Sequence, residues 1–520
     1  MIALTLAEIA EIVGGRLHGS DGTEVVTAGV EFDSRKLRPG GLFIALPGER
    51  VDGHTFAGQA VAAGAVGVLA AREVDAPSVI VPPLAEGIAN PGSGALAGDT
   101  DGSGAAVLAA LGGLARHVVG RLARGGLTVV GVTGSSGKTS TKDLIAQLLE
   151  PLGPTVAPPG SFNNELGHPW TALLADTTTK HLVLELSARG PGHIGELAGI
   201  APPRIGAVLN VGSAHVGEFG SREGIAATKG ELAEALPPAA EGGVAVLNAD
   251  DPLVAAMAER TKARVVLVGE SPTAEIRAVD ISLDDQARAS FRLETPSGAA
   301  DVTLPLHGEH QVGNALTAAA IALELGSTVE EVAARLSAVQ RRSERRMEVS
   351  TRSDGLIVLN DSYNANPESV RAALKALASM GRQRRSWAVL GEMAELGPDS
   401  VAAHDEIGRL AVRLNINRLV VVGERAAAIH QGASHEGSWG EESVLVPDTD
   451  AAVALLRAAL LPADVVLVKA SKVAELWRVA EAVLASEMKG GRASTEPQAR
   501  AEHSPAGNRP DSDERNGGDA

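Results

Sequence analysis

Residues 131–142, GVTGSSGKTSTK, contain the side chains best suited to chemistry in this chain. They follow an apolar run that predicts a strand and precede a helical pattern, which is the context of a phosphate-binding loop. In such a loop glycines let backbone N–H groups approach phosphate oxygens, and the helix N-terminus adds partial positive charge. Lys138 is expected to reach the β- and γ-phosphates of a nucleotide, and the Thr139 hydroxyl to bind Mg²⁺. The other loop residues expected at the phosphates are Thr133, Gly134, Ser135, Ser136, Gly137 and Ser140.

The loop lacks one glycine of the general pattern, because Val132 stands at that position. Residues farther along the chain therefore bear on its interpretation. Glu185 ends an apolar run, His215 follows the next one, and Lys229 lies in a helical pattern. Taken singly, they indicate an ion-paired carboxylate, a loop histidine and a solvated lysine. Their order after a phosphate loop is what a site for ATP and two cations requires, and in doubly wound sheets such residues converge at the carboxyl ends of the strands.

Short apolar runs alternate with helical patterns through most of the chain, which implies parallel sheets covered on both faces. We therefore expect an α/β fold of three domains: a small mixed N-terminal domain, a central doubly wound parallel sheet with the phosphate loop, and a Rossmann-like C-terminal domain. The expected central strands are residues 127–133, 181–187, 205–211 and 244–250, and the expected helices include 223–236 and 310–326. The expected C-terminal strands are GLIVLND, SWAVLGE, RLVVVGE, SVLVPD and DVVLVKAS.

Breaks in composition set the expected domain boundaries. Residues 85–104 are rich in Gly, Ala and Asp without any period, which is typical of a flexible insertion. Residues 340–347, QRRSERRM, predict a basic hinge. The last segment has almost no large apolar side chains and cannot offset its chain entropy by burial. The expected organisation is 1–84 N-terminal domain, 85–125 insertion and connecting helix, 126–340 central ATP-binding domain, 341–486 C-terminal domain and 487–520 disordered tail.

Charge and composition exclude several classes of protein. A formal net charge of −18 disfavours binding to nucleic acid or to an anionic membrane surface. The absence of cysteine excludes disulfides, thiolate metal sites and a cysteine nucleophile. The first residues lack a positive leader and a cleavage site, so we expect no signal peptide. The longest apolar runs, such as residues 60–71, are well short of the roughly 20 residues of a membrane span, which predicts a soluble cytoplasmic protein without stable membrane insertion.

The segment TGSSGKTSTK resembles the loop of the Mur ligases, the ATP-dependent enzymes that extend the cell-wall precursor peptide. Later segments follow in the order of that family: GSFNNELGHPW, LVLELSARGPGHI, LNVGSAHVGEFGS, ATKGEL, GEHQVGNALTAAA and RRMEV. The resemblance implies two Mg²⁺ ions, with Thr139, Glu185, His215 and a carbamylated Lys229 as ligands. It also implies that Arg346 reaches the γ-phosphate of ATP and that adenine is contacted by His310 and Asn314.

Two C-terminal segments, LNDSYNANPESV and LGEMAELG, resemble the branch of the family that adds D-alanyl-D-alanine to UDP-N-acetylmuramoyl-tripeptide. In that branch an acyl phosphate forms first and the dipeptide amine then displaces phosphate. The resemblance implies that Asp361 contacts the ATP ribose and that the 1–84 domain binds the UDP-linked substrate. The residues that it implies at the substrates are Ser34, Arg35, Asn163, Asn164, Asn364 and Asn366; a monomer is expected.

Three positions differ from the family pattern. Trp170 stands where a smaller aliphatic residue is usual, and Ala470 and Lys472 stand where Gly and Arg are expected. Within the family, the alternatives are the ligase for the third amino acid and a folate polyglutamate ligase, and DSYNANP argues against both. From a different class, the alternative is a P-loop switch or motor that hydrolyses nucleotide without an acceptor. A third alternative is an inactive relative that acts as a scaffold.

Overall fold

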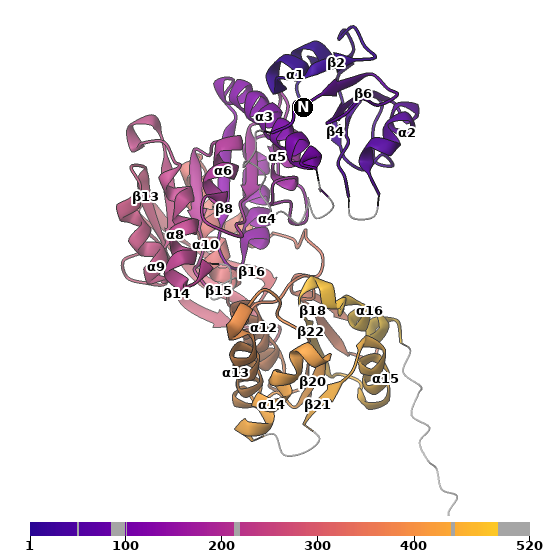
Figure 1. Ribbon diagram of the computed structural model, residues 1–520. Coiled ribbons are helices and arrows are strands. Elements are labelled where there is room, and N and C mark those ends of the chain that lie inside the picture. The colour runs from indigo at the N-terminus through magenta and orange to yellow at the C-terminus, as the bar shows by residue number, and fades with distance from the viewer. Residues whose placement is uncertain (49–50, 85–98, 100, 213–218, 438–441, 487–520) are drawn as a thin grey trace, which may run out of the picture. The chain divides into compact units, whose positions relative to one another are not determined.

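The structure is a computed structural model that describes residues 1–48, 51–84, 99, 101–212, 219–437 and 442–486. Residues 1–485 form one unit. Within the described residues the chain has three large sheets and one two-stranded sheet, with helices between the strands, which confirms the α/β fold class (Figure 1). His215, most of the expected flexible insertion and the expected disordered tail lie outside the described residues.

The N-terminal sheet has five strands in the order β2-β7-β6-β5-β4. All neighbouring pairs are parallel except β2 and β7. Helices α1 (Leu6–Val13) and α2 (Ala57–Ala62) pack on this sheet, and a capping box at Thr5 begins α1. The strands are β2 (Arg16–His18), β4 (Gly29–Glu31), β5 (Gly41–Ile44), β6 (Ala65–Ala70) and β7 (Ser78–Ile80), with β1 (Leu4–Thr5) and β3 (Val25–Val26) as a separate pair.

The central sheet has nine strands in the order β16-β15-β14-β13-β12-β11-β8-β10-β9. In β8, Val129 faces one hydrophobic cluster while Val130 and Val132 face another, because successive strand residues point to opposite faces. Both faces are therefore buried, as the apolar runs predict. The strands are β8 (Thr128–Thr133), β9 (Thr155–Val156), β10 (His181–Glu185), β11 (Ile205–Val208), β12 (Val244–Asn248), β13 (Arg264–Gly269), β14 (Ile276–Leu283), β15 (Arg288–Thr295) and β16 (Gly298–His307).

Three strands extend the central sheet in a way that the sequence analysis did not anticipate. β14 pairs with β15 and β15 with β16 in antiparallel fashion, so the sheet is mixed rather than parallel throughout. The reason lies in the connections, because a two-residue turn between Thr295 and Gly298 can join only antiparallel strands. This extension lies at the far edge of the sheet from β8.

The C-terminal sheet has six strands in the order β17-β18-β22-β19-β20-β21, and only the pair β17–β18 is antiparallel. Its strands are β17 (Glu348–Thr351), β18 (Ile357–Asn360), β19 (Ser386–Leu390), β20 (Arg418–Val422), β21 (Ser443–Val446) and β22 (Val465–Lys469). Its helices are α12 (Pro367–Met380), α13 (Ser400–Arg413), α14 (Ala427–Glu436), α15 (Thr449–Ala459) and α16 (Trp477–Ala485).

The helices around the central sheet fall into two groups that match its two buried faces. α4 (Lys138–Leu149), α10 (Gln311–Glu324) and α11 (Val329–Leu336) pack together on one face. The others are α3 (Ser103–Arg124), α5 (Gly167–Ala172), α6 (His193–Ile200), α8 (Arg222–Glu234) and α9 (Pro252–Ala255). The segment 340–347, expected to be a basic hinge, is held by ion pairs, because Arg342 contacts Glu150 and Arg341 contacts Glu348.

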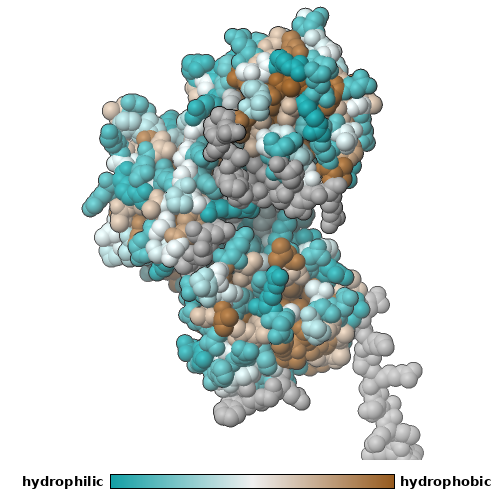
Figure 2. Space-filling view, in the orientation of Figure 1, coloured by the Kyte–Doolittle hydropathy of each residue, from teal (hydrophilic) through white to brown (hydrophobic). Residues whose placement is uncertain are grey.

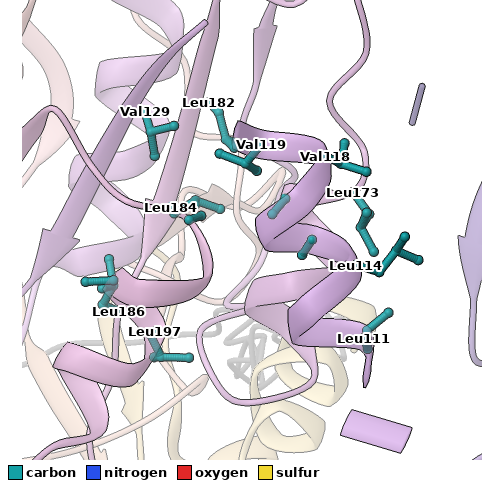
Figure 3. Packing of buried hydrophobic residues seen from close by; sticks show 14 of the residues in the cluster. Leu111, Leu114, Val118, Val119, Val129, Leu173, Leu182, Leu184, Leu186 and Leu197 are labelled. Carbon is teal, nitrogen blue, oxygen red and sulfur yellow. The ribbon is translucent and has the colours of Figure 1, made fainter. Parts of the chain in front are cut away.

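Helix α3 corrects one expectation about apolar length. Its 22 residues are long and apolar enough to span a membrane by length and composition, although the sequence analysis took the longest apolar runs to be far shorter. In the structure 67% of its most apolar window is buried. Leu111, Leu114 and Val118 pack beside residues of β8, β10, α5 and α6 in one cluster (Figure 3). This packing is that of a core helix.

The surface in Figure 2 shows several separate groups of hydrophobic residues surrounded by hydrophilic ones. The large hydrophobic side chains that are exposed are scattered over the described residues, with Val401 and Val473 the most exposed at 68% and 73%. Single exposed apolar residues are ordinary in globular proteins.

Replacing Leu114 with alanine should destabilise the fold, because its side chain is fully buried between α3 and its neighbours. The cavity left by such a change costs about 2–5 kcal/mol. We expect a lower urea midpoint for the first unfolding transition, followed by circular dichroism. His117→Ala, on the exposed side of the same helix, is the matched control and should leave the midpoint unchanged. Equal midpoints for the two variants would contradict this packing.

Candidate active site

The phosphate loop lies where the topology of the central sheet changes direction. β8 lies between β10 and β11, and the chain runs from β8 out to β9 on one side before it returns to build the other side. Loops diverge at such a point and leave a crevice at the carboxyl ends of the strands. The loop after β8, Glu185 at the end of β10 and Asn210 after β11 are all brought to this crevice.

Gly137 is required by its surroundings. Its φ of +82° is one that glycine adopts without strain, and a Cβ there would meet Asn314 Oδ1 at 2.6 Å. The Asn314 amide accepts a hydrogen bond from Thr141 Oγ1 (3.1 Å) and donates one to Gln311 Oε1 (2.9 Å). Asn314 therefore connects α10 to the first turn of α4, directly after the loop, and the contact with adenine that the resemblance implies stays a prediction.

Asn210 holds the other side of the loop. Its Oδ1 accepts a hydrogen bond from the Ser136 backbone N–H (2.9 Å), and its Nδ2 donates to the Ser136 carbonyl (3.2 Å). Its own carbonyl accepts from the Ser135 N–H at 3.1 Å. These bonds fix the backbone of Ser135 and Ser136, and they occupy the N–H groups of both residues. The position of Asn210 at a strand end was the available signal, and the sequence analysis missed it.

Lys138 begins α4 and donates from Nζ to the Gly134 carbonyl at 2.6 Å. The pKa of Lys138 is lowered to about 8, mainly by burial; Glu185 opposes the shift and Arg346 contributes to it. The same causes imply that these three charges lie near one another. The amine is therefore placed among charges of both signs at the end of β8.

The two carboxylate oxygens of Glu185 differ in their hydrogen bonding. Its Oε2 accepts hydrogen bonds from Ser161 Oγ (3.0 Å) and Asn163 Nδ2 (3.2 Å). Its Oε1 is buried and has no hydrogen-bond partner among the described residues. Such an orphaned oxygen is costly unless an ion or ligand completes it. Ser161 was not among the residues that the sequence analysis singled out.

Lys229 lies on α8 and is only 7% exposed. Burial lowers the pKa of its amine to about 7, with a further contribution from Lys138. Near neutral pH a substantial share of this amine is therefore uncharged. Taken singly, Lys229 was expected to be a solvated lysine on a charged helix face, and this expectation is wrong.

A cavity of about 590 Å³ opens in front of the phosphate loop. It brings together residues of the central and C-terminal sheets, and Asn366 Nδ2 donates to the Ser135 carbonyl across it at 3.2 Å. The expected site residues that line it are Ser135, Ser136, Gly137, Lys138, Thr139, Ser140, Asn163, His310, Asn314, Arg346, Asp361, Asn364 and Asn366.

Gly134, Glu185 and Lys229 do not line this cavity, and four further expected residues have other positions. Thr133 is fully buried and its hydroxyl donates to the Leu186 carbonyl, so only its backbone belongs to the loop. Asn164 accepts from the Gly167 N–H within its own turn. Ser34 and Arg35 do not line the cavity of the N-terminal sheet described below, and the Arg35 side chain is 82% exposed and paired with Asp33.

The C-terminal sheet contributes a residue that sequence reasoning missed. Lys469 ends β22, is 2% exposed, and contacts Asp361 Oδ2 at 2.5 Å and the Asn364 carbonyl at 2.9 Å. It therefore neutralises Asp361 and fixes the loop after β18. A lysine at the end of an apolar strand was the signal that could have found it.

A second cavity, of about 420 Å³, lies beside β4. Three aromatic side chains meet there: Trp170 contacts Phe162 (centroids 4.8 Å apart) and Phe32 (6.2 Å). The Trp170 indole N–H also donates to the Val30 carbonyl at 3.1 Å. The charged residues that line this cavity are Glu31, Asp33, Lys36 and Arg38.

Comparison with known families matches three parts of the chain. Residues 26–92 match the model described as "Mur ligase family, catalytic domain". Residues 132–322 match "Mur ligase middle domain", and residues 345–472 match "Mur ligase, glutamate ligase domain". The second of these ranges contains the phosphate loop, Glu185 and Lys229.

Individual relatives match over nearly the whole chain. UDP-N-acetylmuramoyl-tripeptide--D-alanyl-D-alanine ligase of Mycobacterium tuberculosis is 57% identical over 511 residues, covering 94% of this chain and 99% of the relative. The protein of that name from Escherichia coli is 34% identical, covering 93% and 99%.

Solved structures agree with these matches. MurF from Acinetobacter baumannii has a TM-score of 0.79 and 30% identity, covering 93% of this chain and 99% of that one. MurF from Thermotoga maritima in complex with ADP has a TM-score of 0.72 and 28% identity, covering 88% and 97%. The phosphate loop lies at the carboxyl ends of the strands of a mixed central sheet, and relatives match along almost the full length of the chain. The chain therefore belongs to the Mur ligase family.

Proposed function

We propose that this chain joins D-alanyl-D-alanine to UDP-N-acetylmuramoyl-tripeptide, with conversion of ATP to ADP and phosphate. The observation that carries the proposal is the cavity in which Lys138 and Thr139 meet Arg346, Asn364 and Asn366. The relatives named above support the choice of substrates, because those from Mycobacterium tuberculosis and Escherichia coli are named for this reaction. Because the proposed reaction consumes ATP and a UDP-linked precursor, the proposal includes a cytoplasmic location.

The chemical problem is that a carboxylate is a poor electrophile at neutral pH. Transfer of the γ-phosphoryl group to the tripeptide carboxylate gives an acyl phosphate, and attack by the dipeptide amine then expels phosphate. Catalysis of this kind rests on positioning and on neutralising charge. Lys138 and Arg346 would neutralise the negative charge that the carboxylate and the γ-phosphate bring together.

The described residues fit a Mg²⁺ site. The orphaned Glu185 Oε1 and the buried Thr139 hydroxyl are hard oxygen donors, which suit this ion. No cluster of three His, Asp or Glu side chains suited to a metal is found in the part of the chain that the structure describes. A carbamate on Lys229 would supply the missing oxygens, with His215 as a further ligand. When bound, Mg²⁺ would add positive charge beside the γ-phosphate.

The remaining groups would orient the substrates. Asp361, held by Lys469, would contact the ATP ribose. Asn163 lies beside Glu185, where the tripeptide carboxylate would arrive. The aromatic cavity beside β4 would take the UDP end of the precursor, and its two basic residues, Lys36 and Arg38, suit a diphosphate.

The first test is phosphate release by the purified protein with ATP, Mg²⁺ and UDP-N-acetylmuramoyl-tripeptide. We expect release only when D-alanyl-D-alanine is added, together with a pentapeptide product identified by mass spectrometry. Lys138→Met should lower kcat by about 10²–10³, the usual loss for one charge-stabilising contact. Release without any acceptor would favour a nucleotide switch instead, and no turnover with either a lysine or a diaminopimelate tripeptide would contradict the proposed reaction.

The second test addresses Lys229. Carbamylation requires a neutral amine, and with a pKa of about 7 the neutral fraction rises from about 10% at pH 6 to about 90% at pH 8. Protein depleted of CO₂ should therefore regain activity on addition of bicarbonate much faster at pH 8 than at pH 6. A carbamate signal in ¹³C NMR after labelling with ¹³CO₂ would report the modification directly.

Variants provide the control for this test. Lys229→Ala should lose activity and regain part of it with a short-chain carboxylic acid, whereas Lys262→Ala, at an exposed position, should behave like the unmodified protein. Full activity of Lys229→Ala would rule out the carbamate.

A further inference from the structure

Arg346 lies in a turn whose backbone is strained on both sides. Arg345 has a φ of +57° and Met347 a φ of +46°, and neither is glycine. Left-handed backbone at such residues costs free energy and persists only where the surroundings enforce it. The contacts that enforce this conformation therefore indicate the role of the turn, which is to hold Arg346 in place.

Backbone contacts fasten the turn to the loop after β18. The Tyr363 N–H donates to the Arg345 carbonyl at 3.1 Å, and the Met347 N–H donates to Asp361 Oδ1 at 3.0 Å. Asp361 is itself held by Lys469 through its other oxygen. All these residues belong to the C-terminal sheet and its loops, so the arrangement is internal to that part of the fold.

The side chain of Arg346 is held in a different way. Its guanidinium carbon lies 4.2 Å from the centroid of the Tyr363 ring. Its Nε is buried and has no hydrogen-bond partner among the described residues. Both Arg346 and Tyr363 line the cavity at the phosphate loop. The aromatic face, rather than a carboxylate, is thus the contact that the structure provides for this guanidinium.

We propose that Tyr363 is a positioning residue that holds the Arg346 guanidinium toward the transferred phosphate. The assignment rests on the proposed function, in which Arg346 contacts the γ-phosphate. Stacking on a ring fixes the plane of a guanidinium without occupying its N–H donors. A carboxylate partner would fix it equally well, but it would neutralise the charge and compete with phosphate for the donors. The ring leaves both charge and donors available to the nucleotide.

The neighbouring arginine provides a matched control. The Arg345 guanidinium lies 4.3 Å from the Trp477 ring and pairs with Glu481 at 3.6 Å. Neither Arg345 nor Trp477 lines the cavity at the phosphate loop. Trp477→Leu therefore removes an arginine–aromatic contact of the same kind from the same turn without touching the site.

The test compares Tyr363→Leu, Tyr363→Phe, Trp477→Leu and Arg346→Ala in the full chain, each with its melting temperature recorded. We expect Tyr363→Leu to lower kcat about tenfold, corresponding to about 1.4 kcal/mol, with little change in the KM of either acceptor or tripeptide. Tyr363→Phe retains the ring and should keep most of kcat, and Trp477→Leu should keep kcat as well. In the Arg346→Ala background, Tyr363→Leu should cause no further loss, because it acts through that arginine.

A binding measurement makes the result independent of ligase activity. Calorimetry should show that Tyr363→Leu weakens the affinity for the ATP analogue AMP-PNP about tenfold relative to the affinity for ADP, because only the former has a γ-phosphate. If the unmodified protein lacks dipeptide-dependent phosphate release, the proposed function fails while this ratio still decides the role of Tyr363.

Three outcomes would overturn the assignment. One is an unchanged kcat and an unchanged ratio of affinities in Tyr363→Leu. Another is an equal loss of kcat in Trp477→Leu, which would attribute the effect to the stability of the turn. The third is a full further loss in the Arg346→Ala background, which would mean that Tyr363 acts on something other than Arg346.

Discussion

Two neighbouring lysine amines, Lys229 buried and Lys138 partly buried, set the main constraint on this site. Lys138 and Lys229 lie close enough for the charge of one to lower the pKa of the other, and burial lowers both. Such a pair is stable only if negative charge is brought to it or if one amine becomes neutral. Glu185 supplies part of that charge, and nucleotide phosphates together with carbamylation of Lys229 would supply the rest. The site is therefore arranged for an anionic ligand that it has to bind.

The sheet explains how such a site can be held together. β8, β10 and β11 are neighbours, so their carboxyl ends bring the phosphate loop, Glu185 and Asn210 to one edge. Asn210 holds the loop and Asn314 holds the first turn of α4 directly after it, both with neutral amide groups. Neutral groups fix the backbone without adding charge to a place that already has an excess of it. The positively charged side chains of the site thus remain available to the ligand.

The sequence predicts the parts of this site that depend on local pattern. A phosphate loop and the positions of buried strands along the chain follow from residue type and spacing, and the fold class follows from them. Contacts between distant segments could not be predicted in this way. Nothing local indicates that Thr141 donates to Asn314, or that Lys469 pairs with Asp361 across 108 residues. The antiparallel strands β14–β16 were missed because the sequence analysis looked for continuous apolar runs, whereas β15 buries every second residue, at Ala289, Phe291 and Leu293. Ser34 and Arg35 are a different case: they lie between Asp33 and Lys36, which line the β4 cavity, but they are not part of its lining, and their role at the substrate stays a prediction.

The composition of the chain makes the contact between Arg346 and Tyr363 easy to observe by spectroscopy. Tyr363 is the single tyrosine among 520 residues. Biosynthetic incorporation of a fluorinated tyrosine would therefore place one ¹⁹F nucleus beside the Arg346 guanidinium with no substitution elsewhere. Its resonance would report the motions of this arginine in the unaltered enzyme, resolved from every other side chain.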